Sequence, residues 1–408
     1  MGATEESRPS NTVSNGAGDR GTIRAVYAGF VLTGVLTTLL GALIPLLSAG
    51  WAIGDEKTGY LFTAQFAGSL LGVAITSRAF ARLGLLRVIT FSFFFMCVGV
   101  CVLGIAGWPW ALGAVSFYGI GLGAAIPGIN LLVAEATPAR KAAVLNTLNF
   151  GWGIGAVAGP PLIAISARAF GLGRPLWILG LLLGLAGLLL LRQPDSNSGR
   201  PPARQRTSPA KKAEFTPALL LAAFIFLYVG AENSVGGWVA SYADRLSVWP
   251  GYSWALATAL FWGSLLAGRG IAPSLLRFIG QEKLVIAGLI CAAAGNALLL
   301  APLGPDSGRF LAAGIAATGL GFSAIYPISV AALSEFYEED ASRFSSLVFS
   351  MASLGGASLP WLTGLVSSKS GGLRVAFAVP LVASIAMIAV RAPIMWLHKR
   401  LETAQRPA

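Results

Sequence analysis

One carboxylate in this chain of 408 residues stands far from the other charges of its segment. Glu232 lies in the stretch Leu227-Tyr-Val-Gly-Ala-Glu-Asn-Ser-Val-Gly-Gly-Trp238, between the flanking acids Glu214 and Asp244. If this stretch is a helix, those neighbours are roughly 27 Å and 18 Å away along its axis. An acid at such a depth in a membrane helix is costly unless it is paired or protonated, so it indicates ion coupling or substrate binding. The alternative is a protonated carboxyl that only ties two helices together.

The neighbours of Glu232 suggest how it could hold a cation. A buried carboxyl can carry a proton and release it when water reaches it. It can equally stay ionised with bound sodium, helped by Asn233 and by carbonyls freed near Gly236 and Gly237. We therefore expect Glu232 and Asn233 to form the ion-coupling site. Arg269, the one base expected inside a span, is expected to extend toward the cytoplasm rather than to pair with Glu232.

A second set of residues combines amides with aromatic rings. Side-chain amides can hydrogen-bond vicinal hydroxyls, and an aromatic ring can stack on the C–H face of a pyranose. Each amide could instead join two helices, and each ring could simply pack. The expected substrate-binding residues are Asn146, Asn149, Asn130, Gln65, Trp238, Trp262, Tyr326, Trp361 and Tyr228.

The composition shows what kind of scaffold must position these residues. The chain is 55% hydrophobic and 11% charged, with a mean hydropathy of +0.72, which is typical of a polytopic membrane protein. Apolar stretches of about 20 residues predict all-α structure with twelve transmembrane helices. The expected spans are 24–50, 58–80, 87–107, 109–134, 142–167, 175–192, 216–243, 252–274, 284–303, 308–333, 344–367 and 373–397.

The net charge of +12 is distributed as a membrane protein requires, not as a nucleic-acid-binding protein would have it. With a cytoplasmic amino terminus, 21 of the 29 Lys and Arg residues fall in inner segments and 7 in outer loops. This bias predicts that both termini are cytoplasmic and that the lipid bilayer is the partner surface. The residues before the first expected span lack the basic region followed by an apolar region that a cleavable signal peptide has, so we expect none there. The three scattered cysteines and the single His398 predict neither a disulfide framework nor a metal site.

The sequence also repeats itself, at offsets of 195 to 200 residues. Phe30 and Gly34 recur as Phe226 and Gly230, and later matches pair Pro127, Glu135, Gly155 and Pro160 with Pro327, Glu335, Gly355 and Pro360. Such offsets predict a duplicated six-helix unit. We expect a disordered cytoplasmic tail over 1–22, an N-terminal bundle over 23–192, a cytoplasmic linker over 193–215, a C-terminal bundle over 216–398 and a tail over 399–408.

Two pseudo-symmetric six-helix bundles joined by a basic loop resemble the major facilitator superfamily. The family's signature between helices 2 and 3 is similar to Ser77-Arg-Ala-Phe-Ala-Arg82-Leu-Gly84-Leu-Leu-Arg87, although Ala81 replaces its acid. The resemblance implies gating loops at Arg82, Gly84 and Arg87, with Arg277 and Gly280 as their counterparts in the second half.

Within that superfamily the chain resembles the fucose to proton symporters and the sodium-dependent glucose transporters. The similar segments are Tyr228-Val-Gly-Ala-Glu232 with Gly236-Gly-Trp238-Val-Ala-Ser-Tyr242, and Leu145-Asn-Thr-Leu-Asn-Phe-Gly151. The fucose symporter carries acids in helices 1 and 4, which this chain lacks there, so Glu232 must do most of the coupling.

The resemblance implies a secondary transporter of a cell inner membrane that moves a sugar such as a hexose together with a proton or sodium by alternating access. The alternative is a proton-coupled exporter of hydrophobic or drug-like compounds. An enzyme is disfavoured because no second catalytic group accompanies Glu232. No cofactor beyond the coupling ion, no nucleic-acid partner and a monomeric state are expected.

Overall fold

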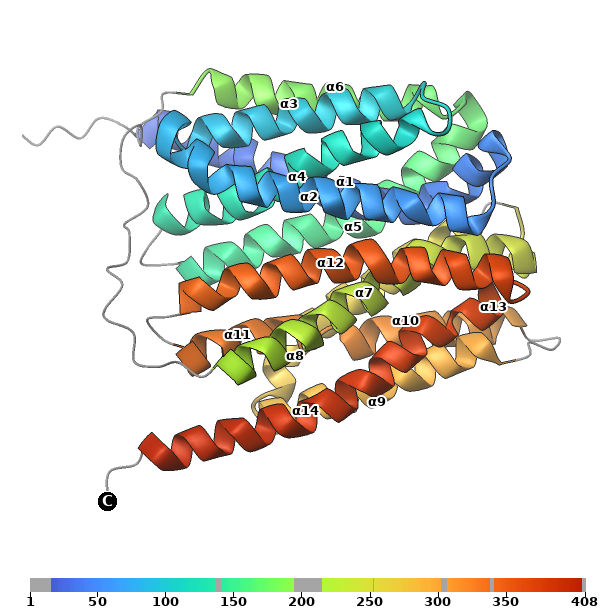
Figure 1. Ribbon diagram of the computed structural model, residues 1–408. Coiled ribbons are helices and arrows are strands. Elements are labelled where there is room, and N and C mark those ends of the chain that lie inside the picture. The colour runs from blue at the N-terminus through green and yellow to red at the C-terminus, as the bar shows by residue number, and fades with distance from the viewer. Residues whose placement is uncertain are drawn as a thin grey trace, which may run out of the picture.

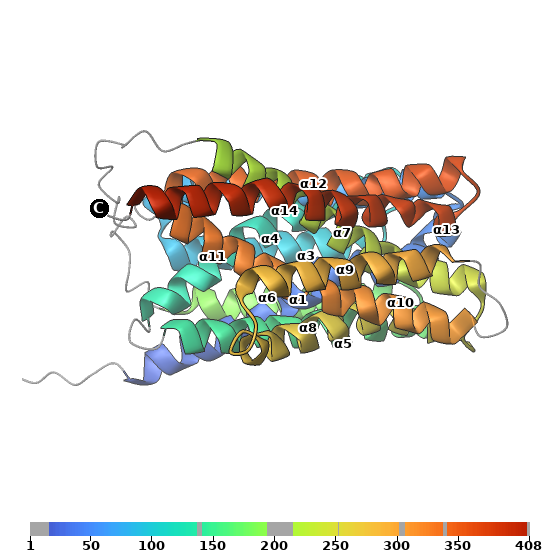
Figure 2. The ribbon, with the colours of Figure 1, turned by 90° about the horizontal axis from the view of Figure 1, so that it is seen from below.

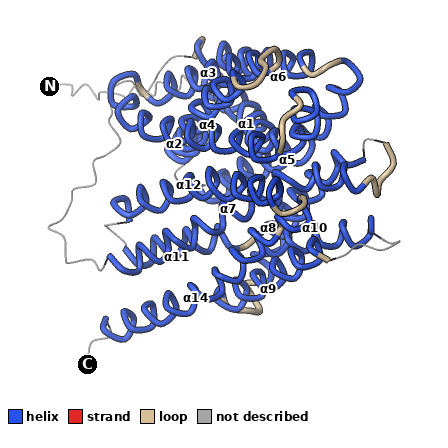
Figure 3. Tube along the Cα trace, turned by 45° about the vertical axis from the view of Figure 1, so that its right-hand side comes forward, coloured by secondary structure: helices blue, strands red, loops and turns tan. Residues whose placement is uncertain are grey.

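The computed structural model describes residues 16–136, 141–193, 215–251, 253–301, 307–337 and 341–405, and its helices lie side by side along one axis (Figure 1). Figure 3 shows the described chain as helices joined by short loops, with no strand among the residues it covers. The predicted all-α architecture is confirmed. The interior of the linker expected over 193–215, the first 15 residues and the last three lie outside the described residues.

The first half of the chain forms one bundle. Its helices are α1 (Gly16–Trp51), α2 (Asp55–Leu83), α3 (Leu85–Leu103), α4 (Trp110–Ala136), α5 (Lys141–Phe170) and α6 (Gly173–Leu191). The second half follows the same order, but three of its spans are each divided into two elements. Its helices are α7 (Phe215–Leu246), η2 (Ser253–Ala255), α8 (Leu256–Leu275), α9 (Gln281–Leu300), α10 (Ser307–Phe322), α11 (Ile325–Tyr337), α12 (Ala341–Lys369), α13 (Leu373–Ala376) and α14 (Ala378–Gln405).

The two ends of the molecule differ in which connections they hold. We call the end where α6 stops and α7 begins the linker end, and the opposite end the far end. The start of α1 and the end of α14 also lie at the linker end, on the left of Figure 1, and Figure 2 shows the same alignment from below. Because the start of α1 and the end of α14 lie at the same end of the molecule, the described chain passes from one end to the other an even number of times.

Close glycine contacts show the same packing in both halves. A Cβ on Gly155 of α5 would lie 2.0 Å from the Val31 carbonyl oxygen of α1, and one on Gly355 of α12 would lie 2.1 Å from the Phe226 carbonyl oxygen of α7. Only glycine allows two helix backbones to approach this closely. Gly155 and Gly355 are a repeat pair found in the sequence, so the duplication corresponds to equivalent helix contacts.

Eleven helical segments of the described chain are long and apolar enough to cross a bilayer. The predicted span over 344–367 corresponds to α12, which is not among the eleven because Ser and Gly dilute its apolar residues. This helix packs against α7 and α2, so protein instead of lipid covers much of it. Counting α12, the described residues make the twelve crossings expected from the sequence.

The predicted span over 308–333 is confirmed as one apolar crossing, but it is broken in the middle. That span is two helices, because α10 ends at Phe322 and α11 begins at Ile325. Pro327 lies in the first turn of α11, where its missing N–H costs nothing, whereas inside a continuous helix it would leave a carbonyl unpaired. The equivalent Pro127 lies within a continuous α4. The break thus belongs to the second half alone.

The bundle edges also differ from the predicted bounds. Helix α1 begins at Gly16, inside the expected tail over 1–22, and α14 continues to Gln405, inside the expected tail over 399–408. Adding a residue to an existing helix needs no new nucleus, so helices extend past the membrane at little cost. The hydroxyl of Thr22 also donates a hydrogen bond to the side chain of Gln193 (2.9 Å), which joins α1 to the end of α6.

Candidate functional site

Glu232 lies buried in the middle of α7, where the structure surrounds it with polar partners. The Tyr228 hydroxyl, one turn earlier on the same helix, donates a hydrogen bond of 2.5 Å to Glu232 Oε1. Arg269 of α8 brings its Nη2 to 3.7 Å from the same oxygen. This Tyr228, Glu232 and Arg269 group, the central cluster below, is the arrangement that a buried carboxylate requires.

The position of Arg269 corrects the expectation that it extends away from Glu232. Its side chain is 29% exposed, and its Nε is buried without a hydrogen-bond partner among the described residues. At 3.7 Å the contact with Glu232 is electrostatic and too long for a hydrogen bond. Arg269 therefore compensates the charge of Glu232, while its Nε–H group makes no hydrogen bond to the described residues.

Aromatic rings close one side of the central cluster at the break between α10 and α11. The Tyr326 ring stacks on Tyr228 with 6.0 Å between centroids, and Phe322 meets Tyr228 edge-on at 5.7 Å. Phe322 ends α10 and Tyr326 is the second residue of α11. The sequence placed Tyr228 and Tyr326 among the substrate-binding candidates, and the structure brings both to Glu232. Broken helices beside a midplane site are a feature of transporter folds.

Trp262 lies on the other side, where the two halves of the molecule meet. Its ring contacts Trp152 of α5 edge-on at 6.3 Å and the adjacent Phe261 at 5.2 Å. It is 5% exposed, and its indole N–H has no partner among the described residues. Trp152 and Trp262 therefore form an aromatic contact between α5 and α8.

Trp238 and Trp361, also expected in the substrate site, lie toward the far end instead. Trp238 is fully buried, and its indole N–H donates to the Pro360 carbonyl oxygen of α12 at 2.8 Å. Its ring also contacts Phe62 of α2 at 6.0 Å. Trp361 of α12 packs on Tyr60 of α2 at 5.8 Å. Both indoles therefore join α12 or α7 to α2 in this conformation.

The amide candidates divide into two groups. Gln65 is 3% exposed, donates to the Thr37 carbonyl oxygen at 3.1 Å and accepts from the Tyr118 hydroxyl at 2.8 Å, so it joins three helices of the first half. Asn130 and Asn233 are half-buried, and each donates at 2.8 Å to a carbonyl of its own helix. The Asn233 amide therefore bonds Val229 in place of Glu232. The side-chain amides of these three residues thus make hydrogen bonds to other atoms of the protein.

Asn146 and Asn149 differ because both are exposed on α5. Asn149 donates to the Leu145 carbonyl oxygen at 2.8 Å, which leaves its side-chain oxygen available. A Cβ on Gly153, one turn further along α5, would lie 2.5 Å from Leu266 of α8. Arg269 follows Leu266 by almost one turn toward the linker end, so the two helices present Asn149 and Arg269 at similar depth.

The expected gating residues lie at the linker end of the α2–α3 and α8–α9 connections. Gly84 has φ +85°, a conformation that disfavours other residues, and it allows α3 to start directly after α2. Gly280 has φ −65°, so its position makes no such demand. Arg82 and Arg277 are exposed, while Arg87 lies in the first turn of α3. The conformational role of Gly84 is thus not repeated in the second half.

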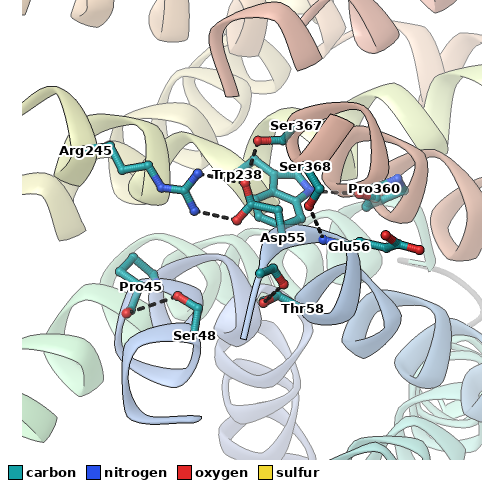
Figure 4. Close-up of polar contacts among 11 residues, drawn as sticks. Pro45, Ser48, Asp55, Glu56, Thr58, Trp238, Arg245, Pro360, Ser367 and Ser368 are labelled. Carbon is teal, nitrogen blue, oxygen red and sulfur yellow. Dashed lines mark hydrogen bonds and ion pairs between the residues drawn. The ribbon is translucent and has the colours of Figure 1, made fainter. Parts of the chain in front are cut away.

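Sequence reasoning missed an ion pair that joins the two halves at the far end (Figure 4). Arg245 at the end of α7 donates two hydrogen bonds to the Asp55 carboxylate at the start of α2, at 2.7 and 2.5 Å. The Ser367 hydroxyl of α12 donates to Asp55 Oδ2 at 2.5 Å, and the Glu56 N–H donates to Ser368 Oγ at 2.9 Å. We call Asp55, Arg245 and Ser367 the far-end clamp. The sequence signal was an acid and a base in different halves, each at a span end on the same side of the molecule.

Helix backbones also meet across the halves beneath this clamp. A Cβ on Gly41 of α1 would lie 2.4 Å from the Gly236 carbonyl oxygen of α7, and one on Gly364 of α12 would lie 2.4 Å from the Asp55 carbonyl oxygen. Such contacts exclude a path for solute between these helices. The far end is therefore closed in this structure.

Comparisons with known proteins agree with this geometry. The chain is 25% identical over 272 residues to a glucose/galactose transporter of Brucella abortus, a match that covers 64% of this chain and only 64% of that relative's length. It is 22% identical over 370 residues to the glucose/mannose transporter GlcP of Bacillus subtilis, covering 85% of this chain and 88% of the relative.

Among solved structures, a point mutant of the nucleoside transporter NupG superimposes with a TM-score of 0.72 at 12% identity, covering 92% of this chain and 99% of that one. This likeness shows a shared fold. The family model described as Major Facilitator Superfamily matches residues 26–274 and 250–408. Nearly the whole chain is thus accounted for, and the protein is a member of the Major Facilitator Superfamily.

Proposed function

We propose that this protein carries out cation-coupled symport of a sugar such as a hexose by alternating access. Two relatives, from Brucella abortus and Bacillus subtilis, are named for the transport of glucose with galactose or mannose. The observation that carries the proposal is Glu232, a carboxylate buried at mid-helix and held by Tyr228 and Arg269. A binding site at this depth is reached from either side when two bundles rock about it.

The coupling cation, a proton or sodium, binds at Glu232. Arg269 supplies an opposite charge at 3.7 Å, so it can compensate the carboxylate when the coupling cation has left. A proton or sodium that arrives at Glu232 takes over this role and releases Arg269. Cation and sugar are linked because each favours the same rearrangement of the cluster.

The sugar site lies between α5 and α8, next to the central cluster. Asn146 and Asn149 are exposed amides on α5, and amides facing hydrocarbon would be costly. Facing an aqueous cavity at the depth of Arg269, they supply donors and acceptors for ring hydroxyls. The rings of Trp262 and Tyr326 supply the apolar faces on which a pyranose stacks. Amides and aromatics together fit a neutral polyol better than a lipophilic cation.

The closed far end is the side away from the cytoplasm. This assignment follows from the excess of Lys and Arg in the connections at the linker end. The protein is then an inner-membrane carrier with both termini in the cytoplasm, acting as a monomer, and the structure is its inward-facing state.

The test is uptake of radiolabelled glucose into proteoliposomes, with a proton gradient and a sodium gradient imposed separately. Accumulation driven by one of the two gradients supports symport and names the cation. If neither gradient moves glucose, galactose or mannose, the proposal fails. Proton-driven extrusion of tetraphenylphosphonium in the same vesicles would instead support the exporter of hydrophobic compounds.

A further inference from the structure

One face of η2 and α8 carries three buried hydrogen-bond donors that have no partner among the described residues. They are the indole N–H groups of Trp254 and Trp262 and the hydroxyl of Thr258. The side chains of Trp254, Trp262 and Thr258 are 3%, 5% and 0% exposed, respectively. A spacing of four residues places them on one side of the helix at intervals of about 6 Å. We call this set the α8 donor row.

Three unpaired donors in a row need an explanation. A buried donor without a partner is destabilising, and Phe or Val would fill similar space without that cost. Other buried donors of these kinds are satisfied, since Thr318 bonds Gly314 of its own helix and Trp238 bonds Pro360. The Ser241 hydroxyl and the Trp361 indole N–H also lack a partner among the described residues, but they lie singly on α7 and α12, whereas the α8 set lies along one helix face. The α8 donor row therefore indicates a site whose acceptors are supplied by something other than the folded chain.

The row lies where the two halves of the molecule meet. A Cβ on Gly236 of α7 would lie 2.9 Å from the Trp262 ring, which also contacts Trp152 of α5. Element η2, which holds Trp254, packs against both α7 and α5. From Trp262 beside the central cluster, the row thus extends about 12 Å toward the closed far end.

We propose that the α8 donor row is a second binding station for a polyhydroxylated solute, occupied when the far end is open. The inference rests on the proposed function for the identity of the solute. Indole N–H groups can only donate, so the ligand must present several spaced oxygen acceptors beside aromatic faces. The oxygens at opposite sides of a pyranose meet this requirement. Thr258 and Trp254 then receive the sugar before it reaches Trp262.

A first test needs no knowledge of the substrate. Thr258→Cys is placed in a chain whose Cys97, Cys101 and Cys291 are replaced by Ser, and a small anionic methanethiosulfonate is applied. We expect slow reaction with the clamp intact and at least about tenfold faster reaction when Asp55→Asn opens the far end. Phe62→Cys, buried in the closed contact, reports whether the far end has opened. A reactive Phe62→Cys together with an unreactive Thr258→Cys would overturn the proposal.

A second test measures sided transport of glucose. Loss of one hydrogen bond to a neutral ligand costs about three- to tenfold in affinity. Trp254→Phe and Thr258→Val should raise KM for uptake from the far-end side by that factor and leave KM from the linker-end side unchanged. The matched controls are Trp177→Phe, which removes an indole N–H bonded to Cys101, and Thr90→Val on α3. Unchanged KM on both sides, or equal increases on both, would contradict a far-end station.

The two tests separate failure of this inference from failure of the proposed function. If the wild-type protein moves no sugar, the proposed function fails, and the thiol reactivity of Thr258→Cys alone decides whether the row faces a solute pathway. If the wild type moves glucose but neither test gives the expected change, symport stands and the station does not.

Discussion

Asp55→Asn should open the far end, because the far-end clamp is a charged contact that holds α2 to both α7 and α12 there. The substitution keeps the shape of the side chain and removes its charge. Asn offers Arg245 one oxygen in place of a bidentate carboxylate, and it weakens the bond from Ser367. The equilibrium should therefore move from the far-end-closed state toward the far-end-open state.

The magnitude follows from the burial of the two partners. The side chain of Asp55 is 7% exposed and that of Arg245 is 44% exposed. An exposed pair contributes about 0–1 kcal/mol, and loss of one partner from a buried pair costs about 3–5 kcal/mol. An intermediate value of about 2 kcal/mol corresponds to a shift of roughly 30-fold in the equilibrium constant.

The assay is double electron–electron resonance between spin labels at Gly50→Cys of α1 and Lys369→Cys of α12, with the three native cysteines replaced by Ser. Asp55→Asn should move population from a short to a long distance, and the pair Asp55→Arg with Arg245→Asp should restore part of the short one. An unchanged distance distribution in Asp55→Asn would refute the reasoning that this clamp holds the far end closed.

Three further predictions concern single positions. Gly41→Ala should also favour the open far end, since its Cβ would meet the Gly236 carbonyl oxygen at 2.4 Å. The control is Gly113→Ala on α4, whose Cβ would meet nothing within 4 Å, and the same distance measurement checks both. Gly84→Ala should destabilise the protein by about 1–3 kcal/mol because of the positive φ, seen as a lower thermal midpoint that Gly280→Ala does not share. Arg269→Gln should lower the cation concentration for half-maximal uptake about fivefold or more, because Glu232 loses a competing charge at 3.7 Å; an unchanged value would show that Arg269 does not compete.

Much of this architecture could be predicted from hydropathy, charge bias and internal repeats. These signals follow from the bilayer, which fixes the length of each span and the side of its charged loops. The break between α10 and α11 was missed because Pro127 and Pro327 recur at equivalent positions, yet α4 is continuous. Local sequence did not distinguish a proline inside a helix from one that starts a helix.

The sequence predicted several residues of the candidate site, but it predicted fewer of the contacts that those residues make. Glu232, Tyr228, Tyr326 and Trp262 were found from residue type and depth. The structure brings the first three together and places Trp262 against Gly236, one turn from Glu232 on α7. Trp238 looked equally suitable, but it lies six residues from Glu232 on another face of α7 and bonds Pro360. Which partner a side chain meets depends on helix rotation and on distant segments.

Long-range pairs were the least predictable contacts. Arg269 and Glu232 lie on different helices, and the Asp55 to Arg245 pair spans 190 residues. The sequence alone does not show which of these charged residues pair with each other. A charge near a span end is normally solvated, so its type and position indicate no particular partner. Only the three-dimensional packing of α2, α7 and α12 brings the far-end clamp together.

The central claim is that Glu232 couples a cation gradient to solute movement, and Glu232→Gln in proteoliposomes tests it most directly. Radiolabelled glucose is followed in two modes, as exchange between equal internal and external pools and as accumulation under a proton or sodium gradient. Glu56→Gln, an acid at the start of α2, is the matched control. The account predicts that Glu232→Gln keeps exchange and loses accumulation while Glu56→Gln keeps both. Gradient-driven accumulation by Glu232→Gln at the wild-type level would contradict it.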